Sequence, residues 1–143
     1  MAKNIIQPAV GRPLDTIRAL VTYPTTVAAT PVPAAGDPVA VGLIPGIAET
    51  NPDTDSPYLT TVRIGPCIAE IPVLGDDGAG SVVATGDKLW IGSTGVVSKL
   101  NTGKAFGVAY GAAQGANSLN PTRTGNLVSS GATTTIQVLV GRF

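Results

Sequence analysis

Residues 60–73 read TTVRIGPCIAEIPV, and the order of apolar and polar side chains in this stretch decides the predicted fold. Before Gly65-Pro66 the apolar positions are even, at Val62 and Ile64; after it they are odd, at Cys67, Ala69, Ile71 and Val73. Side chains alternate between the two faces of a strand, so a slip of one residue reverses the apolar face. We therefore predict two strands joined at Gly65-Pro66 by a bulge or by a corner between sheets.

Glycine and proline interrupt the whole chain of 143 residues. There are 18 glycines and 12 prolines, and the longest stretches free of both are residues 14–23 and 132–140. An interior glycine costs a helix ~1 kcal/mol and a proline ~3 kcal/mol relative to alanine, whereas strands fit between such breaks. Sixteen valines and 17 threonines also favour strands. The predicted class is all-β, a compact β-barrel or β-sandwich with an extended N-terminal arm and long loops.

Three further strands are predicted from alternation. In each of them the apolar side chains lie on one face, with Leu20 an exception in the first strand. The apolar face is formed by Ile17, Ala19, Val21 and Tyr23 in the first strand, by Phe106, Val108 and Tyr110 in the second, and by Ile136, Val138 and Val140 in the third. The chain is short enough for one domain, so we predict an arm over residues 1–13 and a single β-rich domain over residues 14–143. Residues 49–57 and 111–134 are expected to be irregular.

A Gly-Asp segment occurs twice, fifty residues apart. Residues 36–42 read GDPVAVG and residues 86–92 read GDKLWIG, and each is followed by a turn and a second short apolar segment. We interpret the echo as a repeated hairpin in a barrel or sandwich of two similar halves, with chance similarity as the alternative.

The composition excludes several classes of function. Nine Lys and Arg balance nine Asp and Glu, so no basic surplus exists for phosphates and no nucleic-acid partner is expected. With no histidine and one cysteine, no metal site and no cofactor are expected. The uncharged stretch 19–36 contains three prolines, so no membrane span is predicted.

Catalytic residues are predicted to be absent. Glu49 and Glu70 are the glutamates that a glycosidase pair would need, and Asp53 and Asp55 resemble only the start of a calcium loop. Cys67 has no histidine to deprotonate it, so a small buried hydrophobe is the favoured interpretation. We expect the protein not to be an enzyme and to have no small-molecule substrate.

Protein contacts are the remaining chemistry. Charged residues make up 13% of the chain, against ~25% in ordinary soluble proteins. A surface with few charges can cover large areas at a low desolvation cost. We predict contacts through Ile5, Ile6 and Val10 of the arm and through Trp90, which lies opposite Leu89 and Ile91 on its strand. For Trp90, a half-buried position covered by a loop of the same chain is the alternative.

Five segments, in order along the chain, resemble a family of tailed-phage capsid decoration proteins, also called cement or head-stabilising proteins and formerly a domain of unknown function. They are residues 1–8 (MAKNIIQP), 36–42 (GDPVAVG), 46–48 (GIA), 86–90 (GDKLW) and 106–109 (FGVA). The resemblance implies a β-rich homotrimer, made in the host cytoplasm, that sits on the outer surface of the virion capsid and bridges major capsid proteins without catalytic residues or cofactor. Extra residues around 49–60, 74–84 and 112–132 depart from the simplest members.

A second class of function stays open beside this one. A β-sandwich binding module or adhesin, recognising carbohydrate or a cell surface, would share the all-β composition. Such a module needs an aromatic platform, and the chain has two Phe, three Tyr and one Trp.

Overall fold

The computed structural model describes residues 16–24, 33–55, 58–113 and 126–141. All regular elements in these residues are β-strands. The strands are β1 (Thr16–Ala19), β2 (Pro38–Val41), β3 (Ile44–Ala48), β4 (Thr60–Ile64), β5 (Cys67–Leu74), β6 (Val83–Ala84), β7 (Lys88–Ile91), β8 (Val97–Ser98), β9 (Lys104–Ala112), β10 (Asn126–Val128) and β11 (Thr133–Val140). The predicted all-β class is therefore confirmed.

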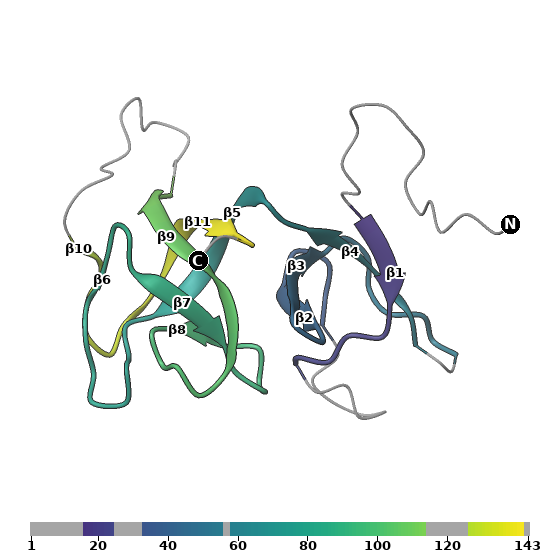
Figure 1. Cartoon of the computed structure of the whole chain (residues 1–143), viewed down its shortest axis with the longest axis horizontal. Helices are drawn as coiled ribbons and strands as arrows, with labels where there is room; N and C mark the ends of the chain where they lie inside the picture. The colour runs from purple at the N-terminus through teal and green to yellow at the C-terminus, as the bar shows by residue number, and fades with distance from the viewer. Residues whose placement is uncertain (1–15, 25–32, 56–57, 114–125, 142–143) are drawn as a thin grey trace, which may run out of the picture.

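The strands form two bodies that lie side by side (Figure 1). The first is a four-stranded antiparallel sheet in the order β1-β4-β3-β2. The second is a closed barrel in the order β11-β5-β8-β7-β9, with the short pair β10-β6 beside it. Of the two predicted architectures, the barrel is the one found. The division into an arm and one domain stays a prediction, because residues 1–13 lie outside the described residues.

The four-stranded sheet curls into a ring around its own small core. After β1 the chain crosses to the opposite edge, where the N–H groups of Thr22 and Tyr23 donate to the Ala40 carbonyl of β2 at 2.8 and 3.1 Å. The Ala40 N–H donates back to the Tyr23 carbonyl at 2.8 Å. The ring encloses a cluster of buried side chains from the strands and from the crossing segment: Val21, Val39, Ala48 and Val62.

The other face of β2 and β3 packs on the barrel. Ala40 is fully buried in the barrel core, and Ile47 and Tyr23 pack against it. The Lys104 ammonium at the start of β9 lies 5.1 Å from the centre of the Tyr23 ring, within cation–π range. The barrel core itself is filled by aliphatic side chains and Phe106. The sheet and barrel thus share one continuous apolar contact.

The Gly65-Pro66 corner is confirmed. It joins β4 of the sheet to β5 of the barrel, and the apolar face changes there as the sequence predicted. Val62 is buried in the sheet core, whereas Ile71 and Val73 are buried in the barrel core. The backbone at Gly65 approaches the end of β11 so closely that a Cβ would lie 2.3 Å from the Val140 carbonyl oxygen. Only glycine fits at this point of the corner.

The Gly-Asp echo is a real structural motif, and both copies exchange backbone hydrogen bonds with an alanine of a partner strand, Ala48 of β3 and Ala109 of β9. Gly36 and Gly86 have φ angles of 97° and 92°, a region that favours glycine. In the turns at residues 34–37 and 84–87, the aspartate N–H donates to the carbonyl of the alanine three residues earlier, at 3.0 and 3.1 Å. The aspartate Oδ2 accepts from that alanine's N–H at 2.8 Å in both turns. Each segment opens an antiparallel hairpin, β2 with β3 and β7 with β8, so the predicted repeated hairpin is confirmed. The two halves are not equal, because one is a four-stranded sheet and the other a five-stranded closed barrel.

The predicted face of β9 is also wrong. Phe106 and Ala109 lie in the barrel core, while Val108 and Tyr110 are half-buried. The pairing register shifts at Phe106 on the β7 side and at Tyr110 on the β11 side. Each extra residue reverses the face that the following side chains take, which simple alternation does not include.

Within the described residues, the first and last predicted strands and the two predicted irregular regions are found, but some of them span fewer residues than predicted. The stretch 14–23 forms a strand over β1 alone within its described residues, and β11 buries Ile136, Val138 and Val140 as predicted. Residues 49–55 contain no strand, as expected. The irregular region was predicted over 111–134, which is too long, because β9 continues to Ala112 and β11 begins at Thr133. The β-branched Thr133 and Thr134 pair with β5, which favours the extended conformation.

Replacing Gly65 with alanine is expected to destabilise the protein by about 1–3 kcal/mol or more, because the added Cβ overlaps backbone atoms that cannot rotate away. Gly92→Ala is the matched control, since its Cβ would meet the nearest atom, the Val96 carbonyl oxygen, at 3.7 Å. Urea unfolding of both variants measures the difference. Equal unfolding free energies for the two variants would contradict the close approach at the corner.

Candidate interaction surfaces

Several charged side chains of the described residues form ion pairs. Arg18 pairs with Asp53, and Arg63 donates through Nε to Glu49 Oε1 at 2.7 Å. Lys99 Nζ lies 3.0 Å from an oxygen of Asp87. Exposed pairs of this kind add little stability, but they cancel charge locally. The full chain is neutral, whereas the described residues carry eight Asp and Glu against five Lys and Arg.

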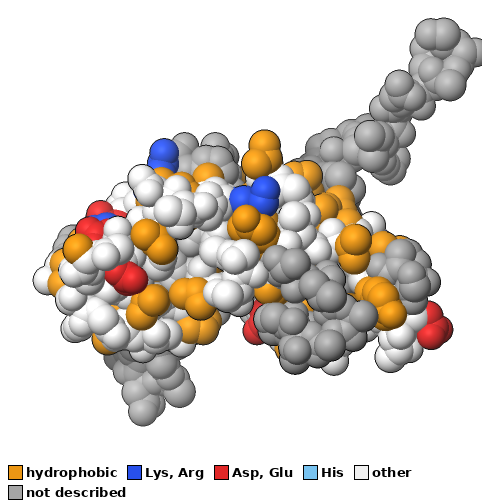
Figure 2. Space-filling view, turned by 90° about the horizontal axis from the view of Figure 1, so that it is seen from below, with side chains coloured by type: hydrophobic (Ala, Val, Ile, Leu, Met, Phe, Trp, Pro, Cys, Tyr) orange, Lys and Arg blue, Asp and Glu red, His pale blue; other side chains and the backbone are white. Residues whose placement is uncertain are grey.

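Exposed apolar side chains are spread over this exterior. Figure 2 shows hydrophobic side chains scattered over one face of the molecule, with few charged groups between them. The exposed large hydrophobic residues belong to both bodies and are Leu20, Leu43, Ile44, Tyr58, Ile68, Val82 and Val96. Contact with another protein would remove this area from water at a low electrostatic cost.

Three of these residues form what we call the apolar tip: Leu20, Leu43 and Ile44. Leu43 follows Gly42 in the two-residue turn between β2 and β3 and is 81% exposed, the largest value among these residues. The Gly42 N–H donates to Thr22 Oγ1 at 2.8 Å, which holds the turn beside the segment that follows β1. Leu20, two residues before Thr22, is 50% exposed and Ile44 is 44% exposed. The fold thus fixes an apolar knob at one end of the sheet.

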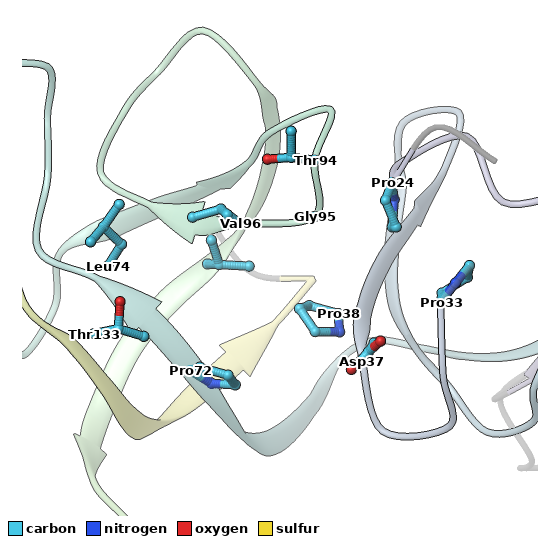
Figure 3. Close-up of a pocket in the computed structure, with 11 residues that line it drawn as sticks. Pro24, Pro33, Asp37, Pro38, Pro72, Leu74, Thr94, Gly95, Val96 and Thr133 are labelled. Atoms are coloured by element: carbon cyan, nitrogen blue, oxygen red, sulfur yellow. The ribbon is translucent and has the colours of Figure 1, made fainter. Parts of the chain in front are cut away.

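A pocket lies where the sheet meets the barrel, and we call it the proline pocket. Its volume is about 260 Å³. Figure 3 shows its two walls, one from the sheet and one from the barrel. The lining residues are mostly apolar: Pro24, Pro33, Asp37 and Pro38 from the sheet side, and Pro72, Leu74, Thr94, Gly95, Val96, Val97 and Thr133 from the barrel side. Proline has no N–H, so these walls offer few donors to a polar ligand.

The predicted contact residues are only partly within the described structure. Trp90 lies on β7 between Leu89 and Ile91, both fully buried, so its side chain points away from the core as the alternation predicted. It is half-buried there. Ile5, Ile6 and Val10 lie outside the described residues, so their role stays a prediction.

The acidic side chains considered for catalysis do not gather into a site. Glu49 and Asp53 are each bound to an arginine, and Glu70 lies on β5 opposite Gln137 of β11. Within the ranges that the structure describes, His, Cys, Asp and Glu side chains form no group of three or more that could hold a metal ion.

The Cys67 side chain is half-buried against the barrel core. Burial raises the pKa of its thiol, and the positive charge of Arg63 offsets part of this rise. A raised pKa keeps the thiol protonated at neutral pH, when it is a poor nucleophile.

The apolar tip and the proline pocket were both missed from the sequence. For the tip, a signal was present: Leu20 broke the alternation of its strand, and Leu43 placed a large apolar residue in a turn. The pocket gave no such signal, because its residues are separated by more than a hundred positions and only the tertiary fold brings them together.

Comparison of the chain with protein-family models, with curated proteins and with solved structures found no match. In the part of the chain that the structure describes, no helix has the length and apolarity required to span a membrane.

Alkylation of Cys67 by iodoacetamide is expected to be slower in the folded protein than in the urea-unfolded chain at the same pH. Its pH profile should rise at a higher pH than that of an ordinary thiol, because the folded-state pKa is raised. Arg63→Gln removes the charge that lowers the thiol pKa, so the rise in alkylation rate should move to a still higher pH. Arg18→Gln should leave the pH of this rise unchanged. A folded protein that reacts as fast as the unfolded chain, with the same profile, would contradict this account.

Proposed function

We propose that this chain is a structural virion protein that decorates the outside of a phage capsid and stabilises it by bridging major capsid proteins, as a homotrimer. The proposal rests first on the five segments that resemble capsid decoration proteins. The structural observation that best supports it is the exterior: charged residues are scarce and several form ion pairs, while large apolar side chains are exposed on both the sheet and the barrel. Such a surface suits broad contact with other proteins.

Bridging works through several weak contacts made at once. Each subunit offers apolar contact residues, and fifteen residues precede β1 in the chain. Linking three subunits makes later contacts intramolecular, so their combined strength exceeds that of any one contact. A shell held together in this way resists outward pressure from packaged DNA.

The carbohydrate-binding alternative has less support. The residues that line the proline pocket are aliphatic, small or acidic, and they provide no aromatic ring for a sugar to stack on.

Heads assembled without this chain provide the direct test. Purified protein should co-sediment with expanded heads, and binding should weaken by more than about tenfold in the Ile5→Asp/Ile6→Asp variant, because two apolar contacts are lost. Gln7→Asp is the control, since it adds a charge to the same segment and keeps both isoleucines. Wild-type protein that stays in the supernatant with heads at saturating concentration would overturn the proposal.

A further inference from the structure

We infer that the outer face of β11 around Gln137 receives a basic side chain of the capsid protein, an inference that rests on the proposed function. Ile136 and Val138, on either side of Gln137, lie in the barrel core, so the Gln137 side chain points away from that core. It is nevertheless only 8% exposed, and its Oε1 atom has no hydrogen-bond partner among the described residues. A buried acceptor without a donor is costly and uncommon in folded proteins. A donor from another protein would satisfy it.

The cross-strand neighbours of Gln137 decide the charge of that donor. Gln137 lies opposite Glu70 of β5 on one side and opposite Gly111 of β9 on the other. Directly opposite residues share a face of the sheet with their Cβ atoms about 5 Å apart, so the exposed Glu70 lies beside the Gln137 amide. Gly111 adds no side chain to this face. A carboxylate beside an amide oxygen favours a cation that carries several N–H donors.

An apolar row lies next to these two acceptors. Ile68, Leu139 and Val108 lie opposite one another across β5, β11 and β9, two residues further along the strands. Ile68 is 51% exposed, and the other two side chains are half-buried. Lys and Arg lay their aliphatic stems along apolar surface while the charged head reaches polar groups. The apolar row and the acceptors therefore match the two parts of one basic side chain.

The amide is placed to meet an arriving donor. Its residue borders solvent, and the three side-chain torsions of glutamine let the amide turn outward while the strand stays in place. The overall charge agrees with a basic partner, because the described residues carry eight Asp and Glu against five Lys and Arg. An arginine uses the arrangement best, since its planar guanidinium has five N–H donors and can bond to Gln137 and Glu70 together.

Binding of full-length variants to heads assembled without this chain tests the site. Gln137→Leu removes the amide and keeps a similar volume. Thr135→Val is the matched control, because it removes a polar group from the same face of the same strand, where Thr135 is exposed. Gln137→Leu should bind heads at least about tenfold more weakly, and the control should bind like wild type. Glu70→Gln should make head binding less sensitive to salt, because a charge is lost from the contact.

Urea unfolding of the free protein gives an independent readout. Gln137→Leu should unfold at a higher urea concentration than wild type, because it removes a buried acceptor that has no donor in the free chain. A lower unfolding midpoint for this variant, or head binding equal to that of wild type, would refute the inference. In the second case wild-type protein still binds heads, so the capsid function would stand. Wild-type protein that does not bind heads would remove both.

Discussion

The packing of Gly65 against the end of β11 is the constraint on which the rest of the structure depends. At this corner the chain leaves the curled sheet and enters the barrel, and a Cβ on Gly65 would overlap the Val140 carbonyl oxygen. The end of β11 thereby fixes the point at which the chain passes from the sheet to the barrel. With Ala40 buried in the barrel core and Lys104 over Tyr23, the two bodies hold a defined arrangement. The proline pocket exists only because of that arrangement, since its walls come one from each body.

The chemistry of the chain follows from the side chains that fill its core and cover its surface. Its interior is filled by aliphatic side chains and Phe106, its charged residues are few, and its exposed apolar side chains are distributed over both bodies. Each exposed side chain is worth little alone, but a repeated array of copies multiplies the contacts. The same low charge that removes repulsion between copies leaves shape and apolar fit to decide the partner. The capsid proposal uses this property.

Much of the fold was predictable because its cause is local. The interruption by glycine and proline predicted strands, and the change of apolar phase at Gly65-Pro66 predicted the corner. Simple alternation failed in β9, where two register shifts produce bulges that depend on the neighbouring strands. The Gly-Asp echo correctly indicated two hairpins, but not that one lies in a four-stranded sheet and the other in a five-stranded barrel, because strand number and closure are decided by tertiary packing. The proline pocket could not be predicted from the sequence, because only the fold brings Pro24, Pro72 and Thr133 together.

Binding through surface fit is the central claim, and a cryo-electron microscopy reconstruction of heads that carry the chain tests it most directly. The account predicts density for three copies around an axis on the outer surface of the shell. A shell whose outer surface lacks this density, or copies bound singly, would contradict it.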